Sequence, residues 1–400
     1  MTEIDLFVLV ATLLVGGILI WPRLAGAKLW RATSTPLASI IGSGFLVLGP
    51  ILDASFGRYA PFAMAGLCLA AYAFGWAVRY NIAEIERRNG KRPPNEERTE
   101  VLASWILAFA YFISVAYYLN LFGAFAVDLT PFDSDVAARG VTTAVFLLVL
   151  AVGWFKGFKA LEGMERISVG IKLAIIAGLL AGLAWFGAGH LASGEIVLAP
   201  AATTGWQAVT LGFGLIVTVQ GFETSRYLGD TYDPETRIRS MRVAQWLSSA
   251  IYLLYIVLLT DAFPPVSGQL EETTIIDMMR IVAVSLPVLL VVAALSAQFS
   301  AAIADTGGSG GLIHELSGKR LAPRDAYLVL VIVGLGLTWL ADIFEIIAYA
   351  SRAFAAYYAV QAALAAITAG RREGMGVRSV VFAGLAVLGA AMAVFGTPVE

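Results

Sequence analysis

The sequence has little of the chemistry that most enzymes and metal sites need. Its 400 residues include one cysteine, Cys68, and two histidines, His190 and His314. A single cysteine excludes an internal disulfide framework and a thiolate metal cluster. The two histidines are far apart and lack metal-ligand spacing. There is no Ser-His-Asp set and no phosphate-cradling motif, so we expect neither an enzyme nor a cofactor.

Charge is also scarce. Charged residues make up 14% of the chain and hydrophobic residues 59%, with a mean hydropathy of +0.79. Soluble domains average about 25% charged and about 45–50% apolar residues. The chain is therefore predicted to be a polytopic protein of the inner (plasma) membrane, with the lipid bilayer as a partner. The net charge of −2 gives no indication of a nucleic-acid partner.

Twelve segments are long and apolar enough to cross a bilayer, which takes about 20 residues. They cover approximately 4–22, 37–54, 60–82, 101–127, 140–158, 166–189, 206–228, 243–263, 281–304, 325–341, 343–369 and 377–396. Acidic Glu3 and Asp5 precede the first segment and Arg23 follows it, which is the reverse of a signal peptide. A charged loop follows the third segment, and a Gly-rich loop, GGSGGLIHELSGKRLAPR, is predicted after the ninth.

Lysine and arginine support this count. If the segments alternate in direction, all basic residues fall on one side except Arg58, Arg139, Arg280 and Arg352. Cytoplasmic loops carry such an excess. We therefore predict that the basic loops are cytoplasmic and that both termini are extracytoplasmic.

Two of the segments contain helix breakers. Residues 40–50 read IIGSGFLVLGP, and the seventh segment reads LGFGLIVTVQGFETSRYLGD, with Glu223 and Arg226 inside it. The two lie five helices apart, and because five is odd, the second set of five must start from the opposite side. Interrupted helices at matching places in two inverted halves indicate the central site of a transporter. Unwound backbone is tolerated in a membrane only where it lines a cavity or meets a ligand.

These motifs resemble a known family. IIGSGFLVLGP resembles the first core helix of the amino acid–polyamine–organocation (APC) transporters, with its I-G-S-G pattern. GFETSRYLGDTYDPETRIRSMR resembles the sixth core helix, where Gly221, Phe222 and Glu223 match its G-F-E. ERISVGIKLAIIAGLLAG resembles the fifth core helix and puts Lys172 at that helix's characteristic lysine.

The resemblance implies an all-α LeuT-type fold with two inverted five-helix repeats and one extra helix before and after them. The organisation would be an added helix and linker (1–36), the first repeat (37–190), the second repeat (200–370) and a last helix (371–400). It also implies alternating access and a solute whose carboxylate meets the first break and whose amino group meets the sixth helix. The implied substrate-binding residues lie in the two breaks and on a bordering helix: Ile41, Gly42, Ser43, Gly44, Val219, Gln220, Gly221, Phe222 and Tyr118. Phe222 would cover the site as a gate, whereas for Tyr118 a packed aromatic stripe is the default interpretation and substrate binding the alternative.

Five further residues are candidates for coupling or gating: Lys172, Glu223, Arg226, Ser296 and Ser300. Lys172 could replace a bound cation and carry a proton, or could extend to the headgroups. Glu223 and Arg226 are three residues apart and could neutralise each other; alternatively Glu223 could hold the unwound backbone or relay a proton. Ser296 and Ser300 share a helix face and suit helix–helix contact better than a sodium site. A proton is therefore favoured over sodium as the coupling ion.

The sequence thus predicts a secondary active transporter for an amino acid or related small organic solute, proton-coupled or exchanging. Two alternatives remain: an inorganic cation transporter of the same fold, for example for potassium, and a channel or membrane sensor that kept the scaffold. Substrate identity, symport or antiport, and oligomeric state stay open.

Overall fold

The computed structural model describes residues 2–42, 44–155, 159–194, 199–228, 232–260, 262–263 and 270–399. Ser43, one of the predicted binding residues, lies outside these. The described part contains helices and no strand, and ten helices in it are long and apolar enough to cross a membrane. The chain is therefore a multi-pass membrane protein, while the count of twelve spans stays a prediction.

Two sets of helices, each opening with a broken helix, form most of the molecule. The first set comprises α3 (Lys28–Ile40), α4 (Gly44–Phe56), α5 (Ala60–Arg87), α6 (Pro94–Asp128), α7 (Asp135–Phe155) and α8 (Lys159–Ser193). The second comprises α9 (Gly205–Gly214), the 3-10 turns η2 (Ile216–Val219) and η3 (Phe222–Tyr227), α10 (Pro234–Leu259), α12 (Leu286–Leu316), α13 (Pro323–Leu340) and α14 (Ile343–Glu373). The remaining elements are α1 (Glu3–Ile20), α2 (Pro22–Ala25), the short turn η1 (Gly57–Tyr59), α11 (Thr274–Val282) and α15 (Val377–Phe395).

The two broken helices run in opposite directions. Lys28, at the start of α3, forms an ion pair with Asp233, which lies just before α10 (Nζ to Oδ2, 2.5 Å). The first broken helix therefore begins on the face of the molecule on which the second one ends. We call this the basic face, because Arg87, Arg88, Arg92, Arg371 and Arg372 also lie there around three glutamates.

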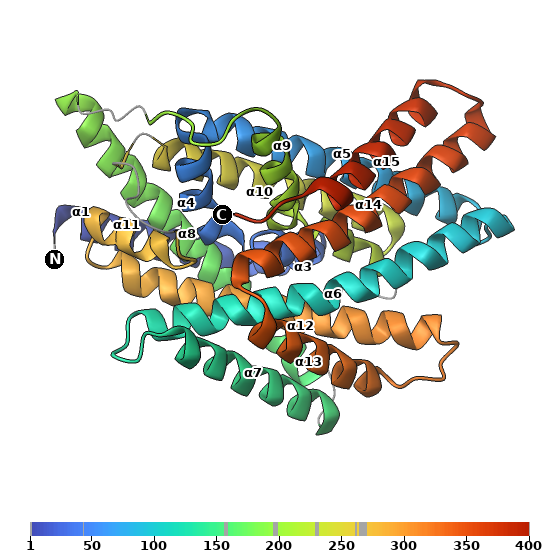
Figure 1. Cartoon of the computed structure of the whole chain (residues 1–400), viewed down its shortest axis with the longest axis horizontal. Coiled ribbons are helices and arrows are strands. Elements are labelled where there is room, and N and C mark those ends of the chain that lie inside the picture. Colours follow the sequence, from blue (N-terminus) through green and yellow to red (C-terminus); the bar gives the residue numbers. More distant parts are fainter. Residues whose placement is uncertain are drawn as a thin grey trace.

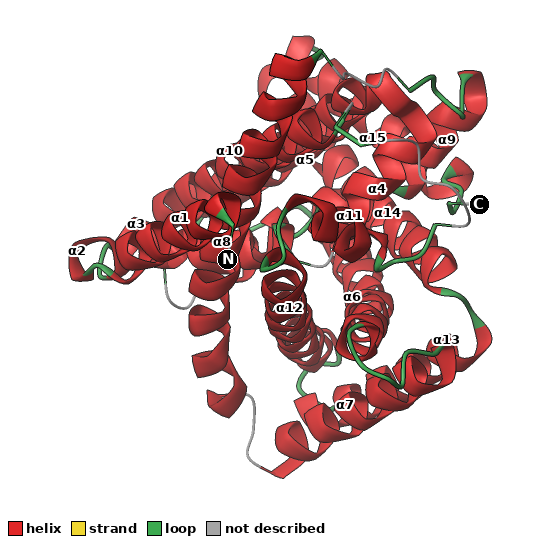
Figure 2. Ribbon diagram, turned by 90° about the vertical axis from the view of Figure 1, so that its left-hand side faces the viewer, coloured by secondary structure: helices red, strands yellow, loops and turns green. Residues whose placement is uncertain are grey.

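The long helices lie side by side, with α6 crossing the middle of the molecule beside α12 and α14 (Figure 1). Seen along the bundle, α6 and α12 are end-on near the centre, while α7 and α13 form an outer pair (Figure 2). Helix α1 packs on α8. Gly178 of α8 faces Thr12 and Val8 of α1, and glycine is needed there because a Cβ would overlap the Thr12 hydroxyl. Both broken helices contact α10, which helps to hold the two breaks together at the centre.

Several predicted boundaries were wrong, for physical reasons. Helix α12 continues to Leu316 through the stretch predicted to be a Gly-rich loop. Its glycines permit close packing, since a Cβ at Gly308 would lie 3.1 Å from the Tyr111 ring and one at Gly310 would overlap the Tyr327 ring. Helix α3 begins at Lys28 rather than near residue 37. The short helix α11 was not predicted; it packs against α12 and α4.

Candidate functional site

The first break separates α3 from α4. Helix α3 ends at Ile40, and Ile41, with φ −85° and ψ 53°, leaves helical geometry while its N–H still donates to Leu37 O (3.0 Å). Helix α4 resumes at Gly44, which packs so tightly that a Cβ there would lie 2.6 Å from Thr218 Cβ. The two breaks are thus in direct contact, and glycine at 44 is what allows the backbones to approach.

Side chains from other helices serve the carbonyls of the first break. A helix end leaves its last carbonyl oxygens without backbone partners. Lys172 on α8 donates from Nζ to Ala38 O (2.6 Å), and its side chain is buried. The Tyr252 hydroxyl on α10 lies 3.0 Å from Ile40 O and 2.6 Å from Thr218 O, so it bridges the two breaks. Lys172 therefore contacts the first break rather than extending to the headgroups.

The second break is longer and needs more partners. Ser351 on α14 donates to Gly214 O (2.6 Å) and accepts from Val217 N–H (3.1 Å), which satisfies the backbone where α9 ends. Gly221 has φ +113°, a conformation that side-chain-bearing residues rarely adopt. Its Cα faces Ser39, and a Cβ there would overlap the Ser39 hydroxyl.

Glu223 holds the unwound backbone of the second break. Its Oε2 accepts from Gly221 N–H (3.0 Å) and from the Tyr358 hydroxyl (2.8 Å). Gln220, next to Gly221, donates from Nε2 to the Tyr118 hydroxyl (2.9 Å), so Tyr118 does border the break. Two buried acceptors in this group, Gln220 Oε1 and Glu223 Oε1, have no hydrogen-bond partner among the residues that the structure describes.

Aromatic rings cover the second break. Phe222 is fully buried and stacks on Tyr358 with ring centroids 5.0 Å apart and planes at 18°. Phe74 on α5 stacks on Tyr358 as well, at 5.3 Å and 19°. Val219 lines a space of about 10 Å³ with Cys68 and Tyr252, enough for about one water. The stacked rings place Phe222 where the resemblance expects a covering residue.

The interpretation that Arg226 neutralises Glu223 was wrong. Arg226 instead forms an ion pair with Glu100 on α6 and hydrogen bonds to Gln361 on α14. Arg92 reaches the same carboxylate at 3.2 Å. Other glutamates nearby are held in the same way, and we call this network the basic clasp: Glu84, Glu96 and Glu100 with Arg87, Arg88, Arg92, Arg226, Arg371 and Arg372.

The two candidate serines on α12 do not meet the first break. Ser300 is buried, but its hydroxyl donates to Ala297 O in its own helix (3.0 Å). Ser296 lies one turn earlier and is partly exposed. The residue of α12 that packs against Gly42 is Ala301, whose Cβ would be 3.5 Å from a Cβ at 42.

Sequence reasoning missed Tyr252, Ser351 and the buried carboxylate Asp305. A tyrosine or serine inside an apolar helix carries no signal that separates packing from bonding to a distant break. Asp305 did carry one, because an ionisable residue inside a membrane helix is costly and usually functional.

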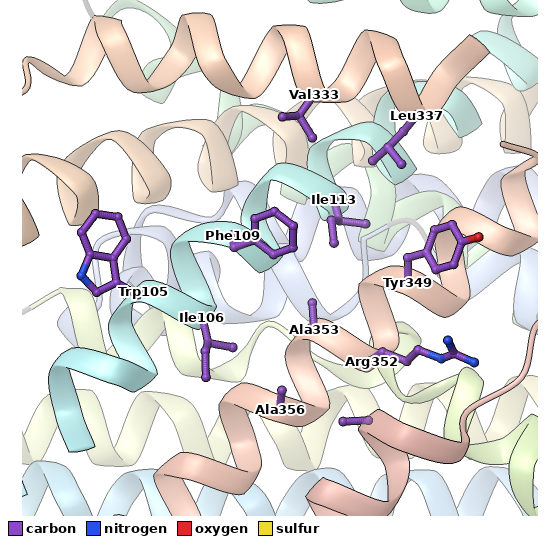
Figure 3. A pocket seen from close by; sticks show the side chains of 11 residues that line it. Trp105, Ile106, Phe109, Ile113, Val333, Leu337, Tyr349, Arg352, Ala353 and Ala356 are labelled. Atoms are coloured by element: carbon purple, nitrogen blue, oxygen red, sulfur yellow. The ribbon is translucent and has the colours of Figure 1, made fainter. Parts of the chain in front are cut away.

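Two larger cavities lie away from the breaks. An apolar groove of about 740 Å³ lies between α6, α13, α14 and α15, with Arg352 as its one charged side chain (Figure 3). Arg352 donates to Gly396 O (2.9 Å from Nε), which occupies its guanidinium. On the face opposite the basic face is a polar cavity of about 890 Å³, which we call the acidic mouth. Its charged lining residues are Asp133, Asp135, Glu271, Glu272, Asp342 and Arg139.

Two inverted helix sets that meet at broken helices, with buried polar groups at the breaks, define a membrane transporter of the LeuT-fold kind. A solved structure supports the fold: Mhp1, a nucleobase-cation-symport-1 family transporter in a closed conformation with bromovinylhydantoin bound, aligns with a TM-score of 0.60 at 15% identity. The alignment covers 92% of this chain and 89% of that one.

The sequence comparisons define the family. The profile of an APC superfamily transporter family matches residues 22–396, which leaves out the whole of α1. A protein of Aquifex aeolicus (strain VF5), described as uncharacterized, is 40% identical over 353 residues, covering 86% of this chain and 85% of its own. The chain belongs to the APC superfamily of transporters. It is a secondary transporter and not an enzyme.

Proposed function

We propose that the chain transports a small organic solute bearing an amino group, such as an amino acid, by alternating access with proton coupling or exchange. The observation that carries this proposal is the pair of buried, unpartnered acceptors at the second break, Gln220 Oε1 and Glu223 Oε1. A buried acceptor without a donor costs about 1–3 kcal/mol. An ammonium group has three donors and no acceptor, so binding one there would remove that cost.

The first break supplies the complementary half of such a site. Helix α4 starts at Gly44, and the first N–H groups of a helix favour an anion. A solute with a carboxylate beside its amine would therefore bridge the backbone of Gly42, Ser43 and Gly44 and the acceptors of the second break. Phe222 would then close over it.

Lys172 supports proton coupling over sodium. Its ammonium donates to Ala38 O, so a positive charge already lies beside the first break, where a bound cation would otherwise be needed. A fixed positive charge at this place removes the need for a bound sodium ion.

An inorganic cation is the second candidate. The same two orphan acceptors would suit it, and the acidic mouth with five carboxylates and one arginine would attract either kind of cation. Burial raises the pKa of Glu272 in this mouth, so part of that attraction would weaken at lower pH.

The test is a thermal-shift screen of the purified protein in lipid, since a ligand that binds the native state raises its apparent stability. The panel contains L-amino acids, the amines and the carboxylic acids that share their side chains, a hydantoin, and potassium and sodium chloride. We expect shifts from amino acids and smaller shifts from the amines. Glu223→Gln should abolish them, whereas Glu235→Gln, exposed on α10, should not.

Flux then separates the candidates. Uptake of a hit by proteoliposomes, driven by a proton gradient, would support the proposal. Potassium flux without any organic solute would favour the cation transporter. Binding of a solute without flux would favour a sensor. If none of the compounds that carry an amine shifts the thermal midpoint, the assignment of the second break as an amine site is overturned.

A further inference from the structure

Asp305 is a buried carboxylate that the proposed site does not use. It lies within α12, is 1% exposed, and belongs to neither break. A carboxylate inside a membrane helix is costly, so it is usually stabilised by its surroundings and kept for a function. Its surroundings are therefore informative.

Ser114 on α6 can satisfy Asp305 in both protonation states. Its Oγ hydrogen bonds to Asp305 Oδ2 and also lies 3.1 Å from Tyr111 O. A hydroxyl has one proton and two lone pairs, so it donates to one of these oxygens at a time. When Asp305 is ionised, Ser114 donates to it. When Asp305 is protonated, the carboxyl donates to Ser114 Oγ, and the serine proton turns to Tyr111 O.

This geometry keeps Asp305 Oδ2 hydrogen-bonded whether or not it holds a proton. A purely structural carboxylate needs partners for its ionised form only. The spare acceptor at Tyr111 O is what lets Ser114 change from donor to acceptor, so Oδ2 can gain or lose a proton without losing its hydrogen bond to Ser114.

Asp305 is also connected to the proposed solute site. Tyr118 lies one helical turn after Ser114 on α6, and its hydroxyl accepts from Gln220 at the second break (2.9 Å). Ser114, which hydrogen bonds to Asp305, and Tyr118, which holds Gln220, therefore lie on the same face of α6. A proton on Asp305 changes the charge within about one helical turn of the residue that holds Gln220.

Asp305 lies at a similar depth in the molecule to the hydrogen bond of Lys172. Gly42, which follows α3, packs against Ala301 on α12. The two helices are antiparallel, so one turn toward the basic face from this contact lie Ala38 and Asp305, and Lys172 donates to Ala38 O. Two titratable side chains lie against this part of α12: Tyr111 from α6, beside Gly308, and Tyr327 from α13, beside Gly310. Lys172 belongs to α8, which also packs on α12.

We propose that Asp305 takes up and releases the coupling proton of this transporter, with Ser114 as the hydroxyl that accommodates both states and Lys172 as the nearby positive charge. In the step itself, one proton from water adds to the Asp305 carboxylate; the reverse step returns it to water. The proposal rests on the proton coupling proposed above and adds the group that carries the proton.

The test is an infrared titration of the protein in lipid over about pH 4–8, where carboxyl groups and histidine titrate. It follows the carbonyl band of protonated carboxylic acids and needs no solute. Asp305→Asn should remove one titrating band. Ser114→Ala should raise the midpoint of that band by about one pH unit, because the ionised form loses a hydrogen bond, and Ser114→Thr should restore it. Asp277→Asn, exposed on α11, is the control.

Persistence of the band in Asp305→Asn, or an unchanged midpoint in Ser114→Ala, would overturn the proposal. Proton-gradient-driven uptake of L-alanine by proteoliposomes separates the two proposals. If the gradient drives uptake by both the wild type and Asp305→Asn, the role of Asp305 is contradicted while proton coupling stands. If the gradient has no effect on the wild type, proton coupling itself fails. If Asp305→Asn still takes up L-alanine but no longer responds to the proton gradient, the assignment of Asp305 is supported.

Discussion

The two broken helices differ in how their buried polar groups are hydrogen-bonded. The first break is short and has no ionisable side chain of its own; its carbonyls receive donors from Lys172 and Tyr252. The second break is longer and carries Gln220 and Glu223, each with an oxygen that no donor from the described part of the chain reaches. The carbonyls of the first break are therefore already hydrogen-bonded, whereas the second break keeps open acceptors for a ligand.

The largest effect should come from Gly221→Ala at the second break. The residue has φ +113°, and the added Cβ would overlap Ser39. Strain of this kind costs on the order of 1–3 kcal/mol, and the overlap adds to it. We expect loss of transport and a marked fall in the thermal midpoint.

Gly212→Ala is the matched control for that variant. Gly212 lies in α9 with no atom near its potential Cβ, and alanine is the better helix former. It should keep or slightly raise the midpoint. Equal losses in both variants would mean that glycine content, not the geometry of Gly221, matters.

The next largest effect concerns the donors of the first break. Lys172→Met and Tyr252→Phe each leave a buried carbonyl short of a donor, which costs about 1–3 kcal/mol, so both should lower the thermal midpoint. Only Lys172→Met removes a titratable positive charge. Uptake by Lys172→Met should therefore change its pH profile, while Tyr252→Phe should retain the wild-type profile. The same pH profile in both variants would contradict a coupling role for Lys172.

The sequence located the breaks better than it located their partners. Helix-breaking glycines inside apolar segments marked both breaks, and the counted segments gave the inversion. Periodicity does not indicate what lies across a helix interface, so the bonds of Tyr252 and Ser351 to the breaks were missed, as was the pairing of Arg226 with Glu100. The glycines of α12 were misread as a loop because glycine lowers helix propensity, yet it also permits contact with Tyr111 and Tyr327.

A smaller effect is expected where the second break meets the basic clasp. Arg226→Gln removes one of two arginines from Glu100, while Arg92 remains at 3.2 Å. Weakening this link by ~1.4 kcal/mol would increase the population opened at the basic face about tenfold. The native thiol Cys68 is buried beside Val219 and can report this opening through its rate of reaction with a maleimide.

The control for the clasp is Arg239→Gln, which removes an exposed ion pair with Glu235. The Cys68 reaction rate should rise with Arg226→Gln and stay at the wild-type value with Arg239→Gln. An unchanged rate in Arg226→Gln would show that the clasp does not hold the second break closed.

The smallest effect should come from the ion pair between Lys28 and Asp233, where the two broken helices meet at the basic face. The hydrogen bond from Lys28, followed by those from the Thr236 N–H and hydroxyl, lowers the pKa of Asp233 below its usual range. A lowered native pKa adds stability above the unfolded value, about 3.9, and that stability is lost as pH falls through the native value. Both side chains are largely exposed (64% and 45%), so salt screens the pair. Asp233→Asn, which keeps a capping side chain, should lower the thermal midpoint slightly at neutral pH and low salt, and not at high salt. A fall as large as that of Lys172→Met would mean that the first break depends on this contact as much as on its buried donors.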